Sequence, residues 1–170
     1  VAVVFMNTNA AASGGLIGAL LVARLLFGKA DLTMAVNGAL AGLVAITADP
    51  LSATGGMATL IGAIGGAIVV LSVSFFGKLQ IDDPVGAISV HGVVGIWGLL
   101  AVTINADVTV MAQLTGAAVI FAWTFVASSI VWYILKLAMG IRVSEEQEYE
   151  GVDASECGID AYPEFVNSKS

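Results

Sequence analysis

The sequence has 170 residues, of which 58% are hydrophobic and only 11% are charged, and its mean hydropathy is +0.97. Soluble domains carry about 25% charged residues, so this composition excludes an ordinary soluble domain and indicates a membrane protein. The formal net charge of −7 is concentrated near the C-terminus, because eight of the thirteen acidic residues follow Gly140 and only Arg142 and Lys169 oppose them there. A single cysteine, Cys157, cannot form an internal disulfide.

Five apolar runs follow one another along the chain. A helix needs about 20 residues to cross a hydrocarbon core of about 30 Å, and the runs are too long and too irregular in alternation for the strands of a barrel. We therefore expect an all-α membrane protein with five transmembrane helices and an acidic tail. The helices are expected at residues 1–27, 32–48, 57–76, 84–104 and 108–139, and the tail at residues 141–170.

Two runs depart from the usual span length. The second is short, which leaves room for its helix to extend into the polar flank, and the fifth is long enough to tilt or to project beyond the bilayer. The chain begins inside an apolar run, without an initiator methionine or the basic segment of a signal peptide. We therefore expect it to be the C-terminal piece of a longer polytopic protein.

Basic residues predict the orientation of the chain. They occur in alternate loops: Arg24 and Lys29 after the first run, Lys78 after the third, and Lys136 and Arg142 at the end of the fifth. The two other loops contain neither lysine nor arginine. Since cytoplasmic loops carry the excess of Lys and Arg, we expect the first helix to run inward and the acidic tail to be cytoplasmic, with the protein in the cell membrane.

Small residues predict how the helices pack. The pairs Gly14 and Gly18, Gly38 and Gly42, and Gly62 and Gly66 each form GxxxG in a separate run, and Gly92, Gly95 and Gly98 recur every three residues in the fourth. Close backbone approach holds helices together in lipid, so we expect tight interhelical contacts at these glycines. The alternative is that glycine is simply common in membrane helices.

His91 is the only histidine of the chain and lies inside the fourth run. An ionisable residue in a membrane span is costly and is by default a candidate functional residue. Its neighbours one α-helical turn away are Ala87 and Gly95, so the ring would have space beside it. We expect a neutral imidazole, because burial disfavours the charged form, and such a ring both accepts and donates a hydrogen bond. The alternative is a structural histidine bonded to a backbone carbonyl.

The residues before His91 read as a helix start. Pro84 fits the first helical position, and Asp82 or Asp83 fits the cap. This start would place His91 about 10 Å along the helix. The alternative for the two carboxylates is a catalytic or ion-binding role, and we favour the cap.

Other polar and aromatic residues in the apolar runs allow two interpretations. Asn7, Thr8, Asn9, Asn37 and Thr47 either form hydrogen bonds that stabilise the helices or line a polar path, and we favour the first. Three tryptophans are expected to pack or to anchor at the interface: Trp97, Trp123 and Trp132.

No metal-ligand spacing, phosphate-binding loop or nucleophile elbow occurs, since the glycines follow helical spacing. We expect no enzyme, no cofactor, no metal and no nucleic-acid partner.

Four segments resemble one family. Residues 82–98, DDPVGAISVHGVVGIWG, resemble the tenth transmembrane helix of the Amt/MEP/Rh ammonium transporters, Amt branch. Residues 37–48, NGALAGLVAITA, look like the eighth helix, and residues 7–15, NTNAAASGG, like the seventh. Residues 140–153, GIRVSEEQEYEGVD, resemble the cytoplasmic tail. The resemblance covers nearly the whole chain in order and spacing.

The resemblance implies an eleven-helix inverted-repeat fold, a homotrimer, and one pore per subunit, with this chain supplying the seventh to eleventh helices. His91 falls on the second of the family's two pore histidines, Ala87 and Leu40 fall on apolar pore-lining positions, and Thr47 lies near the outer mouth. The first histidine belongs to the fifth helix, outside this chain. The implied mechanism recognises ammonium outside, deprotonates it and passes ammonia through an apolar lumen past paired imidazoles.

The resemblance of the tail to the family's cytoplasmic tail implies a regulatory contact with a trimeric PII-type signalling protein. The tail residues that carry this resemblance are Gly140, Arg142, Glu145, Glu146, Gly151 and Asp153. Two features depart from bacterial relatives: Cys157 stands where they often have histidine, and PEFVNSKS extends beyond the usual end. The alternative is a disordered acidic tail.

For the protein as a whole, the alternatives are a proton-coupled secondary transporter of another small solute and an ammonium sensor on the same fold.

Overall fold

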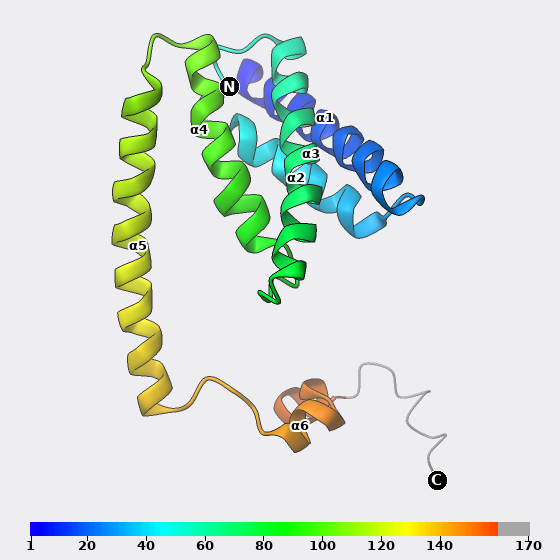
Figure 1. The fold of residues 1–170 in the computed structure, drawn as a ribbon, viewed down its shortest axis with the longest axis vertical. Helices are drawn as coiled ribbons and strands as arrows, with labels where there is room; N and C mark the ends of the chain where they lie inside the picture. Colours follow the sequence, from blue (N-terminus) through cyan, green and yellow to red (C-terminus); the bar gives the residue numbers. More distant parts are fainter. Residues whose placement is uncertain (160–170) are drawn as a thin grey trace. The chain divides into compact units, whose positions relative to one another are not determined.

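The computed structural model describes residues 1–159, and all regular structure within them is helical, which confirms the expected all-α fold (Figure 1). The remaining residues of the predicted tail, 160–170, lie outside the described residues. The elements are α1 Ala2–Phe27, α2 Leu32–Thr47, α3 Gly55–Lys78, the π-helix η1 Ile88–Val93, α4 Val94–Asn105, α5 Val110–Ala138, α6 Glu145–Glu150 and the π-helix η2 Asp153–Cys157.

Four of the described segments are long and apolar enough to span a bilayer: Ala2–Phe27, Gly55–Lys78, Ile88–Asn105 and Val110–Ala138. The second predicted span, α2, is a shorter apolar helix of 16 residues, which at 1.5 Å per residue reaches about 24 Å. It does not extend into its polar flank. Its first turn is closed by Asp31, whose carboxylate accepts a hydrogen bond from the Met34 N–H at 2.9 Å, and it ends at Thr47 before the turn that contains Pro50.

Capping residues fix the other boundaries. Gly28 ends α1 in the left-handed conformation, with φ 73°, and its N–H donates to the carbonyl of Arg24 at 2.9 Å. Thr54 precedes α3 and accepts a hydrogen bond from the Met57 N–H at 3.3 Å. This cap starts α3 at Gly55, two residues before the apolar run, because a helix begins where its first free N–H groups find acceptors rather than where hydropathy rises.

Helices α1, α2 and α3 pack against one another and cross closely (Figure 1). The six glycines of the three GxxxG pairs make this possible, as predicted. A Cβ added to Gly62 would fall on the carbonyl of Ala11, and one added to Gly66 would fall on the carbonyl of Gly15. Around them the buried core consists mainly of alanine and valine, so the helices touch backbone to backbone.

The glycine series of the fourth run does not pack as predicted. Gly98 lies against α2, where an added Cβ would be 3.0 Å from the carbonyl oxygen of Ala45. An added Cβ at Gly95 would meet nothing within 4 Å, and one at Gly92 only a side-chain carbon of Ile88 at 4.0 Å. Residues three apart on a helix are displaced around its axis, so the whole series cannot face one neighbour.

Polar side chains within the apolar helices form hydrogen bonds of two kinds. Asn7 is completely buried, and its amide donates to the carbonyls of Pro50 at 2.9 Å and Ala53 at 2.7 Å, which ties α1 to the loop between α2 and α3. Trp97 donates from α4 to the carbonyl of Ile61 at 3.0 Å. Three others bond to carbonyls of their own helices: Thr8 to Val4, Asn9 to Phe5 and Thr47 to Leu43. The preference for structural hydrogen bonding is therefore correct for Asn7, Thr8, Asn9 and Thr47.

The chain divides into two compact units, Val1–Phe121 and Ala122–Ser170. Helices α1 to α4 and η1 belong to the first. Helix α5 carries no buried residue, and Trp123 and Trp132 on it are exposed. In the second unit, α6 begins with a capping box in which Ser144 and Gln147 exchange hydrogen bonds.

The candidate pore histidine and its π-helical turn

The helix that carries His91 begins at Ile88 and not at Pro84. Pro84 and Val85 lie in a turn that is closed by a hydrogen bond of 3.1 Å from the Gly86 N–H to the Asp83 carbonyl. Gly86 then adopts φ 74°, a left-handed conformation that interrupts any helix started at Pro84. The predicted span of residues 84–104 is therefore Ile88–Asn105, and His91 stands about 5 Å from its start rather than 10 Å.

Asp83 is the carboxylate that meets the start of this helix. It accepts hydrogen bonds from the N–H groups of Ile88 at 2.9 Å and Ser89 at 3.1 Å. Partial burial raises the pKa of Asp83, but the hydrogen bonds from the backbone of Ile88 and Ser89 and from the Ser89 hydroxyl outweigh it and hold the pKa below its usual value. Asp82 is exposed, so the two aspartates are not equivalent.

His91 lies within a π-helical turn. The N–H of Val94 bonds to the carbonyl of Ser89, a span of five residues instead of four. Such turns are rare and are found frequently at functional sites. The expectation that Ala87 and Gly95 flank the ring assumed α-helical spacing, and the wider turn changes which residues stand above and below it.

The four residues assigned to the pore are all exposed on the described chain: His91, Ala87, Leu40 and Thr47. The expected burial of the imidazole is therefore not provided by the described residues. Leu40 and Thr47 belong to α2, which packs against η1 and α4. The hydroxyl of Thr47 donates to the Leu43 carbonyl at 2.6 Å, so its proton is already engaged.

Two contacts near His91 were not predicted from the sequence, although Asn37 was noted there as a polar residue of the second run. Ser72 on α3 donates a hydrogen bond of 3.0 Å to the hydroxyl of Ser89, and the two side chains are 8% and 0% exposed. Asn37 on α2 packs against Gly86, where an added Cβ would be 3.0 Å from the amide nitrogen. Serine and asparagine are unremarkable in a membrane helix by type, so only their partners reveal these contacts.

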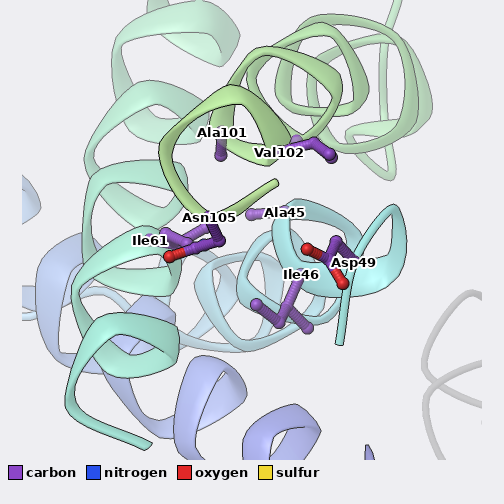
Figure 2. A pocket seen from close by; sticks show the side chains of 8 residues that line it. Ala45, Ile46, Asp49, Ile61, Ala101, Val102 and Asn105 are labelled. Carbon is purple, nitrogen blue, oxygen red and sulfur yellow. The ribbon is translucent and has the colours of Figure 1, made fainter. Parts of the chain in front are cut away.

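A separate small hollow lies between the C-terminal ends of α2 and α4 and the side of α3 (Figure 2). It is lined by Ala45, Ile46, Asp49, Ile61, Gly98, Ala101, Val102 and Asn105. One carboxylate oxygen of Asp49 accepts from the N–H and hydroxyl of Ser52, at 3.1 and 2.9 Å. His91 does not line this hollow, which therefore is not part of the histidine site.

The tail residues assigned to regulation lie at or near the ends of α5, α6 and η2. Gly140 follows α5 with φ 79°, the conformation that a helix C-cap favours. Arg142 precedes α6, and Glu145 and Glu146 occupy the first turn of α6, where negative charge is favourable. Gly151 has φ 114° and its N–H donates to the Gln147 carbonyl at 3.0 Å, while Asp153 begins η2.

Several apolar helices of spanning length and one imidazole exposed on a π-turn define an integral membrane protein with a candidate transport site. A family model described as the Ammonium Transporter Family matches residues 1–162. The chain belongs to this family.

Individual relatives agree with the family assignment. An ammonium transporter of Archaeoglobus fulgidus, Amt2, is 39% identical over 98% of this chain and 40% of its own length. The ammonium transporter of Bacillus subtilis is 32% identical over 95% of this chain and 44% of its own length. The chain thus spans less than half the length of these relatives. Because they are named as transporters, the expectation that the protein is not an enzyme is confirmed.

Solved structures show the same fold. A structure described as a Sensor Amt Protein superposes with a TM-score of 0.84 and 33% identity, over 91% of this chain and 42% of that one. Saccharomyces cerevisiae Mep2 superposes with a TM-score of 0.74 and 26% identity, over 85% of this chain and 37% of that one.

Proposed function

We propose that the protein conducts ammonium by deprotonating it and passing ammonia through an apolar pore in which His91 is the second of two imidazoles. The observation that carries this proposal is the exposed imidazole on a π-turn of an otherwise apolar membrane helix. The family assignment supports ammonium as the substrate.

Physical chemistry explains why a histidine suits this task. An apolar passage of about 30 Å strongly penalises a bare cation. Potassium cannot lose its charge, whereas ammonium can lose a proton and cross as a neutral molecule. A neutral imidazole can accept a hydrogen bond from ammonia on one nitrogen and donate one from the other. Ala87 and Leu40 would keep the rest of the lumen apolar, and Thr47 would lie near its outer mouth.

The complete site requires residues outside this chain. The relatives are more than twice as long as the segment that matches. We propose that the part of the full-length protein outside this chain covers the exposed side chains of His91, Ala87 and Leu40. The first imidazole would come from that part. In this proposal the protein assembles as a homotrimer with its acidic tail in the cytoplasm, and the alternation of basic loops supports this orientation.

The experiment is transport by the full-length protein in proteoliposomes, with ammonium or methylammonium and with potassium. We expect ammonium flux and no potassium flux. His91→Ala should reduce ammonium transport sharply while the protein still assembles, and His91→Glu should recover some transport and weaken the exclusion of cations. Thr115→Ala, which removes a hydroxyl bonded to its own helix at Met111, is the control. Equal ammonium and potassium fluxes, or wild-type transport in both His91 variants, would contradict the proposal.

Transport is favoured over sensing because the curated relatives are named ammonium transporters. A proton-coupled carrier of another solute would need a second charged site, and the family assignment does not point to one.

The tail is proposed to contact a PII-type cytoplasmic protein. Arg142 and the acidic first turn of α6 are exposed and offer charge of both signs to such a partner. Deletion of residues 141–170 should leave the membrane part folded and abolish binding in a pull-down with a PII-type protein. Equal binding by the truncated and intact proteins would exclude the tail as the contact.

A further inference from the structure

In the π-turn, Ser89 forms hydrogen bonds with its N–H, its carbonyl and its hydroxyl. Its N–H donates to the Asp83 carboxylate at 3.1 Å, and its carbonyl accepts the N–H of Val94 that closes the wide turn. Its hydroxyl accepts a hydrogen bond of 3.0 Å from Ser72 and also bonds to the Asp83 carboxylate. Ser89 is therefore fixed on three sides, two residues before His91.

The hydrogen bonds run in one direction, from the Ser72 hydroxyl through the Ser89 hydroxyl to the Asp83 carboxylate. Ser72 donates to Ser89, and the Ser89 hydroxyl proton is then available for the ionised carboxylate of Asp83. Both serines lie at or below 8% exposure, and a buried hydroxyl that loses its partner costs more than an exposed one. The link joins α3 to the turn of η1.

His91 stands on the opposite, exposed side of the same turn. Val90, between Ser89 and His91, is 1% exposed and packs in the core. The turn is thus held from behind, by α3 and by Asp83, while the imidazole faces outward. If the π-turn relaxed to α-helical spacing, the turn would contain one residue fewer. His91 would then rotate by about 100° about the helix axis relative to the residues before the turn.

We infer that Ser72 is a positioning residue for His91, acting through the hydroxyl of Ser89 to hold the π-turn that presents the imidazole. This inference rests on the proposed function, because it assigns Ser72 a role in ammonium transport. It adds a residue on a different helix from the histidine, outside the four pore positions.

The test uses the full-length protein in proteoliposomes and four variants. Ser72→Ala and Ser89→Ala each remove one hydroxyl of the pair, the double variant removes both, and Ser74→Ala is the matched control. Ser74 lies on the same helix, and its hydroxyl bonds to the Val70 carbonyl of that helix at 2.8 Å. The net value of one hydrogen bond corresponds to about a fivefold change in a conformational equilibrium. We therefore expect ammonium transport to fall by up to about fivefold in Ser72→Ala. It should fall further in Ser89→Ala, which also loses the bond to the Asp83 carboxylate, and the double variant should be no lower than Ser89→Ala.

A spectroscopic readout separates positioning from a general loss of stability. In protein labelled with ¹⁵N-histidine, the His91 imidazole signal is identified by its absence in His91→Glu. We expect this signal to shift or broaden in Ser72→Ala and to be unchanged in Ser74→Ala. If Ser72→Ala does not fold, Ser89→Ala provides the comparison, since it removes the same hydrogen bond together with the bond to Asp83.

Failure of the inference is distinguishable from failure of the proposed function. If wild-type protein does not transport ammonium, the proposed function is wrong, and the imidazole signal alone decides whether Ser72 positions His91. If transport and the His91 signal are both as in wild type in Ser72→Ala, the inference is overturned. If transport falls equally in Ser74→Ala, the effect belongs to α3 in general, and the inference is likewise wrong.

Discussion

Gly66→Ala adds a single methyl group but should lower the free energy of unfolding of the membrane part of the protein. The added Cβ would fall on the carbonyl oxygen of Gly15 in α1 and would lie 2.7 Å from its carbonyl carbon and 2.9 Å from its Cα. Ordinary carbon contacts are about 3.5–4.0 Å, so α1 and α3 must separate by about 1 Å at this point. Neither helix can yield locally, because the contact is with backbone and not with a flexible side chain.

The magnitude follows from two opposing effects. Overpacking a tight contact costs about 1–3 kcal/mol, and the separation also loosens the next contact, between Gly62 and Ala11. Replacing a helical glycine by alanine gains about 0.5–1 kcal/mol. Gly77→Ala on the same helix receives only the gain, since an added Cβ there meets nothing within 4 Å. The two variants should therefore differ by about 1–3 kcal/mol in the free energy of unfolding, with Gly66→Ala the less stable.

The assay is reversible unfolding of the full-length protein in mixed detergent micelles with increasing SDS, followed by circular dichroism. Gly66→Ala should unfold at a lower SDS fraction than wild type, and Gly77→Ala at the same or a higher one. Coincident unfolding curves for the two variants would show that α1 and α3 do not approach as closely as the structure describes.

Three further predictions concern the turn before His91 and the tail. Gly86→Ala should cost more than about 1–2 kcal/mol in the same assay, because a side chain is strained at φ 74° and the new Cβ would also crowd Asn37. The folded-state pKa of Asp83 lies below its usual value of 3.8, so the stability from its ionised form is complete above that pH and is lost as the pH falls through the folded value. In acid unfolding curves, Asp83→Asn should therefore approach wild type only below pH 3.8. Asp82→Asn, which replaces the exposed neighbouring aspartate, is the matched control. Ser144→Ala should remove the capping box and cost α6 about 0.5–2 kcal/mol, seen as faster amide hydrogen exchange in that helix.

The number and kind of helices could be predicted because lipid allows few alternatives. A backbone in hydrocarbon must satisfy its own hydrogen bonds, so long apolar runs are helices, and α1, α3 and α5 follow their runs within two residues at each end. Helix α2 also follows its predicted run, 32–48, to within one residue, with Asp31 as its N-terminal cap. The error came at the fourth span, where the Asp83–Gly86 turn delays the helix by four residues relative to Pro84.

The surroundings of His91 could not be predicted in the same way. A π-turn inserts one residue and shifts the phase of the helical pattern. The fourth run is apolar or glycine at nearly every position, so this shift cannot be seen in its hydrophobic periodicity. The Ser72–Ser89 hydrogen bond joins residues 17 apart on two helices, and their spacing says nothing about which faces meet. Spacing likewise does not show that Gly98 faces α2, whereas a Cβ added to Gly95 would meet nothing within 4 Å.

The described chain holds His91 from one side only, and this arrangement has a physical consequence. Behind the turn, Val90 and Ser89 are buried and the Asp83 carboxylate accepts two backbone N–H groups, so the backbone that carries the imidazole has little freedom. In front, the side chain is exposed. A group that must exchange hydrogen bonds with a moving neutral molecule needs a fixed backbone and an accessible ring, because a preorganised donor or acceptor loses little entropy at each encounter. Replacing Ser89 or Asp83 behind the turn should therefore alter transport without changing the proposed pore surface, whereas replacing residues in front should alter which molecules pass.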